Sequence, residues 1–207
     1  MDPYYTVDGV SRGFDLYKRT TDASNLAVGP YVTDSLGAGI KFGYPVSEQI
    51  SVDLGGNVES VELEIFSNSP LAYINFVNSF GTKYTYGSLS AGWARDTRDS
   101  LITTTAGTYL RASSELAGGD LSYYRLGYQH QWYKPLTRAL TLHVGGEIGY
   151  AGGYGDKPLP FFKNFFAGGP GSVRGYRSFS LGPIDELGNA TGGNRKLTGS
   201  VEVLFPM

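Results

Sequence analysis

The chain has 207 residues, including 30 glycines and 16 tyrosines, and its 17 basic and 19 acidic residues leave a net charge of −2. This near balance excludes the strongly basic surface that nucleic-acid binding requires, and the lack of cysteine excludes disulfides and thiolate metal sites. No apolar stretch reaches the ~18 residues of a membrane helix. The first residues carry no signal-peptide pattern, so we expect a mature segment.

Alternation of apolar and polar residues with a period of two, broken by turn residues, predicts β-strands and no helix. The clearest case is 140–150, where Val144 and Ile148 share one face while His143 and Glu147 share the other. Each predicted strand is near or above the ~9–11 residues that cross a bilayer. The eight strands are expected at about 9–19, 35–44, 50–60, 83–96, 106–117, 121–134, 140–150 and 196–205.

The two faces of these strands differ in chemistry. The apolar faces end in Tyr, Trp and Phe, as the aromatic girdle of a membrane barrel requires, and the other face mixes both charge signs. By parity His143 points inward and His130 outward. We therefore expect an all-β fold, an eight-stranded, transmembrane, antiparallel up-and-down β-barrel forming one domain over 1–207. The inward polar network is expected to contain Asp15, Lys41, Asp53, Arg111, Glu115, Arg125, Glu147 and Glu202.

Connections alternate in length along the chain. Those near 45–49, 97–105 and 136–139 are short or modest, and those near 20–34 and 61–82 are long, although 118–120 is a tight turn. Short periplasmic turns and long extracellular loops are typical of outer-membrane barrels. The longest connection is 154–193, and a loop of this length is usually functional or disordered. Its aromatic and glycine content argues against disorder, but the sequence does not decide whether the loop is ordered. Its four phenylalanines at 161, 162, 165 and 166 are expected to pack inside the loop itself.

This loop contains the motif Val173-Arg174-Gly175-Tyr176, preceded by the segment 160–165, which reads PFFKNF. With the segments 2–10 and 201–206, these residues resemble the outer-membrane protein assembly factors of the BamA family, in the bacterial surface antigen superfamily. The resemblance covers the whole chain in family order. It implies that the chain corresponds to strands five to twelve of a 16-stranded barrel, without the N-terminal POTRA domains and without the first and last strands, whose weak seam forms the family's lateral gate.

The resemblance also implies a role for each motif residue. Arg174 matches the family arginine that bonds to inward-facing acids, and Glu202 matches its partner on strand twelve. Gly175 would allow a tight backbone path, and Tyr176 would pack against the lumen wall. The implied function is insertion of β-barrel proteins into the bacterial outer membrane without a cofactor. The implied partners are the lipid bilayer, assembly-complex lipoproteins and unfolded outer-membrane clients.

Two other readings stay open on sequence alone: a passive eight-stranded outer-membrane barrel or small pore, and a two-partner secretion transporter, which shares the loop motif. The sequence contains no set of nucleophile, base and orienting residue, and no metal-ligand spacing. We therefore expect a protein that is not an enzyme and binds no metal.

An even number of strands can close, and ~8 strands enclose an interior that side chains just fill. We therefore expect the eight strands to close on themselves as a monomer, with an edge-to-edge dimer as the alternative. So narrow a lumen cannot hold the long loop. Arg174 is thus expected outside the barrel or at its mouth, with its contact to Glu202 broken, and the chain alone is expected to be inactive.

Overall fold

The computed structural model describes residues 5–6, 9–23 and 28–205. Residues 2–4, 7–8 and Pro206, which contribute to the family resemblance, lie outside this range. Within the described residues eight antiparallel strands form one sheet in chain order. They are β1 (Ser11–Asp22), β2 (Tyr31–Ser47), β3 (Ile50–Ile65), β4 (Lys83–Asp96), β5 (Gly107–Gly119), β6 (Tyr123–Pro135), β7 (Thr141–Gly153) and β8 (Arg195–Leu204).

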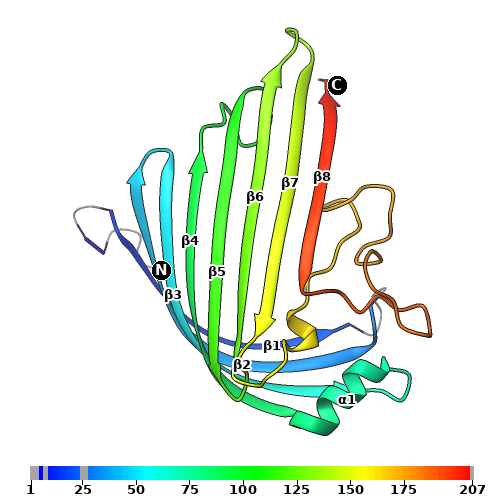
Figure 1. Cartoon of the computed structure of the whole chain (residues 1–207). Helices are drawn as coiled ribbons and strands as arrows, with labels where there is room; N and C mark the ends of the chain where they lie inside the picture. Colours follow the sequence, from blue (N-terminus) through cyan, green and yellow to red (C-terminus); the bar gives the residue numbers. More distant parts are fainter. Residues whose placement is uncertain (1–4, 7–8, 24–27, 206–207) are drawn as a thin grey trace.

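The connections divide between the two ends of the sheet (Figure 1). Residues 48–49, 97–106 and 136–140 turn at one end, and residues 23–30, 66–82, 120–122 and 154–194 connect strands at the other. The all-β, up-and-down architecture predicted from alternation is therefore confirmed. We call the end that carries residues 48–49, 97–106 and 136–140 the short-turn end, and the opposite end the loop end.

The outer face of the sheet is a band of exposed large apolar side chains. The face is identified by register, because Leu36 and Val58 share its parity while Asp15 and Glu59 do not. Exposed apolar side chains on every strand match a wall that lipid covers. The band includes Leu16, Leu36, Leu54, Val58, Leu89, Leu116, Leu126, Ile148, Leu197 and Val201.

A helix, α1 (Leu71–Phe80), interrupts the connection between β3 and β4, so the expectation of no helix was wrong. Pro70 precedes it, and no side chain caps its first turn. Its stability comes from packing, because Tyr73 is only 1% exposed and stacks on Phe161 at 3.8 Å between ring centroids. Among the described residues, no helix is long and apolar enough to span a membrane.

The sheet is open, so the expectation of a self-closed eight-stranded barrel was wrong. Among the described residues β1 pairs with β2 and β8 pairs with β7, and the two edge strands do not meet. The reason is steric. The buried aromatic side chains of α1 and of the loop after β7 cover the inner face at the loop end, and an eight-stranded lumen has room for little more than its own side chains.

Candidate functional site

The 154–194 loop is ordered by its own pairing and lies against the inner face. Phe165 and Gly193 exchange two backbone hydrogen bonds, of 2.8 and 3.0 Å. Ala167 bridges Leu181, and further isolated bridges join Gly169 to Val173 and Ile184 to Ala190. The loop also reaches the connection between β1 and β2, through the Gly29 N–H bond to the Ala190 carbonyl.

Lys163, at the end of a short 3₁₀ turn (Phe161–Lys163), is seated most deeply of the loop cations on the inner wall. Its side chain is only 20% exposed, and its Nζ lies 3.8 Å from Glu115 Oε1. The ammonium also lies 5.4 Å from the Tyr86 ring centroid and 5.3 Å from that of Tyr123. Burial lowers the pKa of the Lys163 ammonium, although the nearby Glu115 carboxylate opposes this shift.

The acids near Lys163 are held by tyrosine hydroxyls from neighbouring strands. Tyr123 donates to Glu115 at 2.6 Å, and Tyr86 donates to the buried Glu59 at 2.7 Å. Arg125 adds a second cation, with its Nη1 3.9 Å from Glu115 Oε2. A carboxylate removed from water requires such donors, and here they fix the position that receives the loop lysine. We call Lys163 with Glu115, Tyr86 and Tyr123 the lysine anchor.

Phe165 continues the contact two residues further along the loop. The Arg125 guanidinium carbon lies 4.6 Å from the Phe165 ring centroid, within the range of a cation–π interaction. The ring lies so close to β7 that a Cβ placed on Gly149 would meet it at 2.9 Å. Glycine at 149 therefore allows the aromatic ring to lie flat against the strand. The expectation that the loop phenylalanines pack only within the loop was wrong.

The motif residue Arg174 reaches the inner wall near β8. Its Nη1 lies 3.8 Å from Glu202 Oε1, and its side chain is 74% exposed. The second Glu202 oxygen lies 3.7 Å from His143 Nδ1, and His143 stacks on Tyr133. The expectation of a broken Arg174–Glu202 contact was therefore wrong. It assumed a closed narrow lumen, whereas the open sheet leaves its inner face accessible to the loop.

Gly175 has the backbone conformation that the resemblance implies, whereas Tyr176 does not make the contact that it implies. Gly175 has φ +85°, a conformation that L side chains rarely adopt, so the backbone path here requires glycine. Tyr176 is 56% exposed and does not pack against the wall. A cleft of about 420 Å³ separates the motif from the strands, lined by Gln131, His143, Ser172, Arg174, Ser200 and Glu202 among others.

The remaining inward charges form separate pairs and not one network. Lys41 lies 2.7 Å from Asp15, and Lys196 lies 2.5 Å from Glu147. Asp53 and Arg111 line one shallow groove, and within the described residues neither takes part in an ion pair. Over the same residues no three His, Cys, Asp or Glu side chains gather as metal ligands would.

Comparison with known proteins gives consistent matches. Residues 1–207 match the Omp85 superfamily domain. The chain is 40% identical over 223 aligned residues to outer membrane protein assembly factor BamA of Neisseria meningitidis serogroup B, covering 100% of this chain and 28% of that protein. It is 33% identical over 123 residues to the sorting and assembly machinery component 50 homolog of Mus musculus, covering 58% of this chain and 26% of that one.

The fold matches the crystal structure of BamA from Haemophilus ducreyi lacking POTRA domains 1–3, with a TM-score of 0.90 at 27% sequence identity. That match covers 100% of this chain and 44% of the other. The chain thus spans less than a third of the curated relatives it matches. Together with the apolar outer face, these matches identify the strands as wall of a β-barrel in the outer membrane of a Gram-negative bacterium, and the chain belongs to the Omp85 superfamily.

Proposed function

We propose that this chain forms part of the barrel of a factor that inserts other β-barrel proteins into the outer membrane. The names of its relatives, an outer membrane protein assembly factor and a sorting and assembly machinery component, support this role. The observation that carries the proposal is the loop held on the inner wall, at Lys163 and at Arg174.

The proposed mechanism involves no covalent step and no cofactor. The eight strands provide a fixed wall, and the loop joins β7 and β8 to the connections at 23–30 and 66–82 through the aromatic core. Client strands would enter at a weak seam between the first and last strands of the complete barrel, which the family resemblance implies. Unfolded outer-membrane clients and assembly-complex lipoproteins are the proposed partners. In this scheme the wall keeps its shape while the seam opens.

The test is client folding in liposomes that contain the complete barrel protein of which this chain is proposed to form part. We expect a faster rate of client folding than in empty liposomes, and a reduced rate for Arg174→Ala. The control is Arg177→Ala, which removes the same charge from the same loop at a residue outside every ion pair of the described chain. Ion flux without faster client folding would instead identify a pore. Equal rates of client folding for Arg174→Ala and Arg177→Ala would show that Arg174 has no specific role in the mechanism.

The 207-residue chain by itself is proposed to be inactive. Among the described residues each of its two edge strands has one side without a partner strand, and such an edge pairs readily with other strands and so favours aggregation. The same liposome assay with the isolated chain should give the rate of empty liposomes. Acceleration of client folding by the isolated chain would contradict this.

A further inference from the structure

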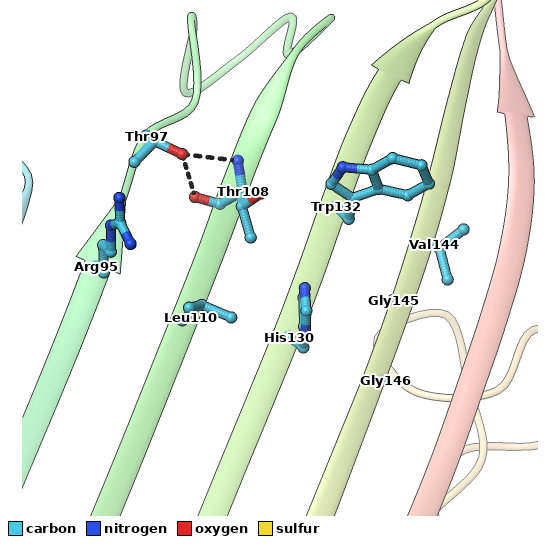
Figure 2. Close-up of a pocket in the computed structure, with 9 residues that line it drawn as sticks. All are labelled: Arg95, Thr97, Thr108, Leu110, His130, Trp132, Val144, Gly145 and Gly146. Carbon is cyan, nitrogen blue, oxygen red and sulfur yellow. Dashed lines mark hydrogen bonds between the residues drawn. The ribbon is translucent and has the colours of Figure 1, made fainter.

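A second site lies on the opposite face of the sheet, near the short-turn end. A groove of about 750 Å³ crosses β4 to β7 there, and Figure 2 shows the side chains that line it. Thr97 and Thr108 close one end, where the Thr97 hydroxyl donates to the Thr108 carbonyl at 3.1 Å and accepts the Thr108 N–H at 3.0 Å. The other lining residues are Arg95, Leu110, His130, Trp132, Val144, Gly145 and Gly146.

The strand register explains the hollow. Arg95 lies opposite Leu110, Leu110 opposite His130, and His130 opposite Gly146, so one row across four strands runs from a cation to a glycine. Gly146 has no side chain to fill the row, and Trp132 forms one wall above it, opposite Val144. The row shares the parity of the apolar band and faces away from the loop.

Arg95 is an unusual residue for this face. Its side chain is exposed, and within the described residues it forms no ion pair with an acid. An arginine on a lipid-covered wall is costly unless an anion meets it. It lies one residue before the end of β4, one row further from the short turns than Trp132, an aromatic residue of the kind that marks the membrane interface. Phosphate groups lie at this depth, and arginine binds them with several donors.

We propose that this groove seats one anionic glycerophospholipid from the membrane leaflet at the short-turn end. Its phosphodiester would meet the Arg95 guanidinium, and the His130 imidazole N–H would donate to the same headgroup. One acyl chain would lie against Leu110 and continue towards the bilayer core over the next outer-face row, past Ala112 and Tyr128. The occupant is a lipid and not a protein segment, because the groove opens within the apolar band that the bilayer already covers.

Native mass spectrometry of the detergent-purified protein tests the proposal with phosphatidylglycerol and phosphatidylcholine as probes. We expect the protein to retain phosphatidylglycerol in preference to phosphatidylcholine. Arg95→Gln should lower phosphatidylglycerol retention about tenfold, equivalent to about 1.4 kcal/mol, and abolish the preference. The matched control is Arg138→Gln, which removes the same charge from the nearby 136–140 turn outside the groove and should retain lipid as the parent does.

A second variant, Val144→Trp, keeps the charge of Arg95 and fills the groove with a larger side chain. Val144→Trp should also lower phosphatidylglycerol retention, while Arg95→Lys should preserve the preference in part. Heat-modifiable migration on gels verifies that each variant is folded. Equal retention of the two lipids by the parent, or equal losses in Arg95→Gln and Arg138→Gln, would overturn the proposal.

Discussion

Lys163 and Arg174 both join the 154–194 loop to the inner wall, but their surroundings differ. The Lys163 side chain is 20% exposed and has an acid and two aromatic rings around it, whereas that of Arg174 is 74% exposed and meets one carboxylate at 3.8 Å. Exposed pairs of the second kind contribute about 0–1 kcal/mol. At the scale of the residue, Lys163 therefore makes the more enclosed contact with the wall, and the motif arginine makes the more exposed one.

Replacing Lys163 by methionine, which keeps the length and removes the charge, should loosen the loop. Loss of the cation–π contacts costs about 0.5–2 kcal/mol. Amide hydrogen exchange at residues 161–167 should rise by about twofold to thirtyfold. Lys157→Met is the control, because the half-buried Lys157 belongs to the same loop but donates to the Gly119 carbonyl, away from Glu115. Equal exchange at 161–167 in the two variants would show that Lys163 does not anchor the loop.

Asp99 in the 97–106 connection should titrate well below an ordinary aspartate. Hydrogen bonds from the Thr105 hydroxyl, from the Thr105 N–H and from the Ala106 N–H lower its pKa to about 2. Because the folded pKa is depressed, the turn gains stability above the ordinary value near 3.8 and loses it as the pH falls through about 2. Carbon-13 NMR of the Asp99 carboxyl measures the midpoint, and a midpoint near 3.8 would exclude this arrangement.

At the scale of the element, α1 and the loop form one aromatic core over the loop end. Phe161 stacks on Tyr73 and meets Tyr31 edge-on at 5.3 Å. The Tyr73 hydroxyl lies 3.3 Å from the Thr191 carbonyl, and the Ser69 hydroxyl donates to the Pro30 carbonyl at 2.7 Å. Three connections far apart in sequence therefore depend on a single cluster of rings.

Phe161→Ala should destabilise this cluster strongly. Removal of a buried phenylalanine costs about 3–5 kcal/mol, and Phe161 is only 6% exposed. Phe179→Ala in the same loop is the control, because Phe179 is 40% exposed. Amide hydrogen exchange of the α1 residues in increasing denaturant measures both. A shift in the midpoint that is no larger for Phe161→Ala would contradict the dependence of α1 on the loop.

The strands could be predicted from the sequence, whereas α1 and the contacts of Lys163 could not. All eight strands were predicted to within a few residues at most ends, because apolar and polar residues alternate along each strand. The helix α1 was missed because its sequence, LAYINFVNSF, has neither a capping residue nor charges at helical spacing, and it forms against Phe161. Lys163 was missed for a related reason. Its partners, Glu115, Tyr86 and Tyr123, lie on other strands, and nothing local to PFFKNF points to them.

At the scale of the whole molecule, the open sheet leaves β1 and β8 with unpaired outer edges. In a bilayer each unpaired backbone group is costly, so the isolated chain should pair edge to edge. Light scattering corrected for detergent should give two or more chains per micelle. One chain per micelle would mean that the strands close after the loop has left the inner face, and Arg174 would then lose Glu202.

The strands pair only with their neighbours in sequence, but the connections between them differ greatly in length. Closing a hairpin costs more entropy as its connection grows, and residues 154–194 form the longest connection. The hairpins joined by 48–49, 120–122 and 136–140 can therefore form early in folding, whereas the pairing of β8 with β7 is expected to be slower. We therefore expect β8 to be the last strand to pair, so that its pairing with β7 also brings the ends of the 154–194 loop together at the edge of the wall.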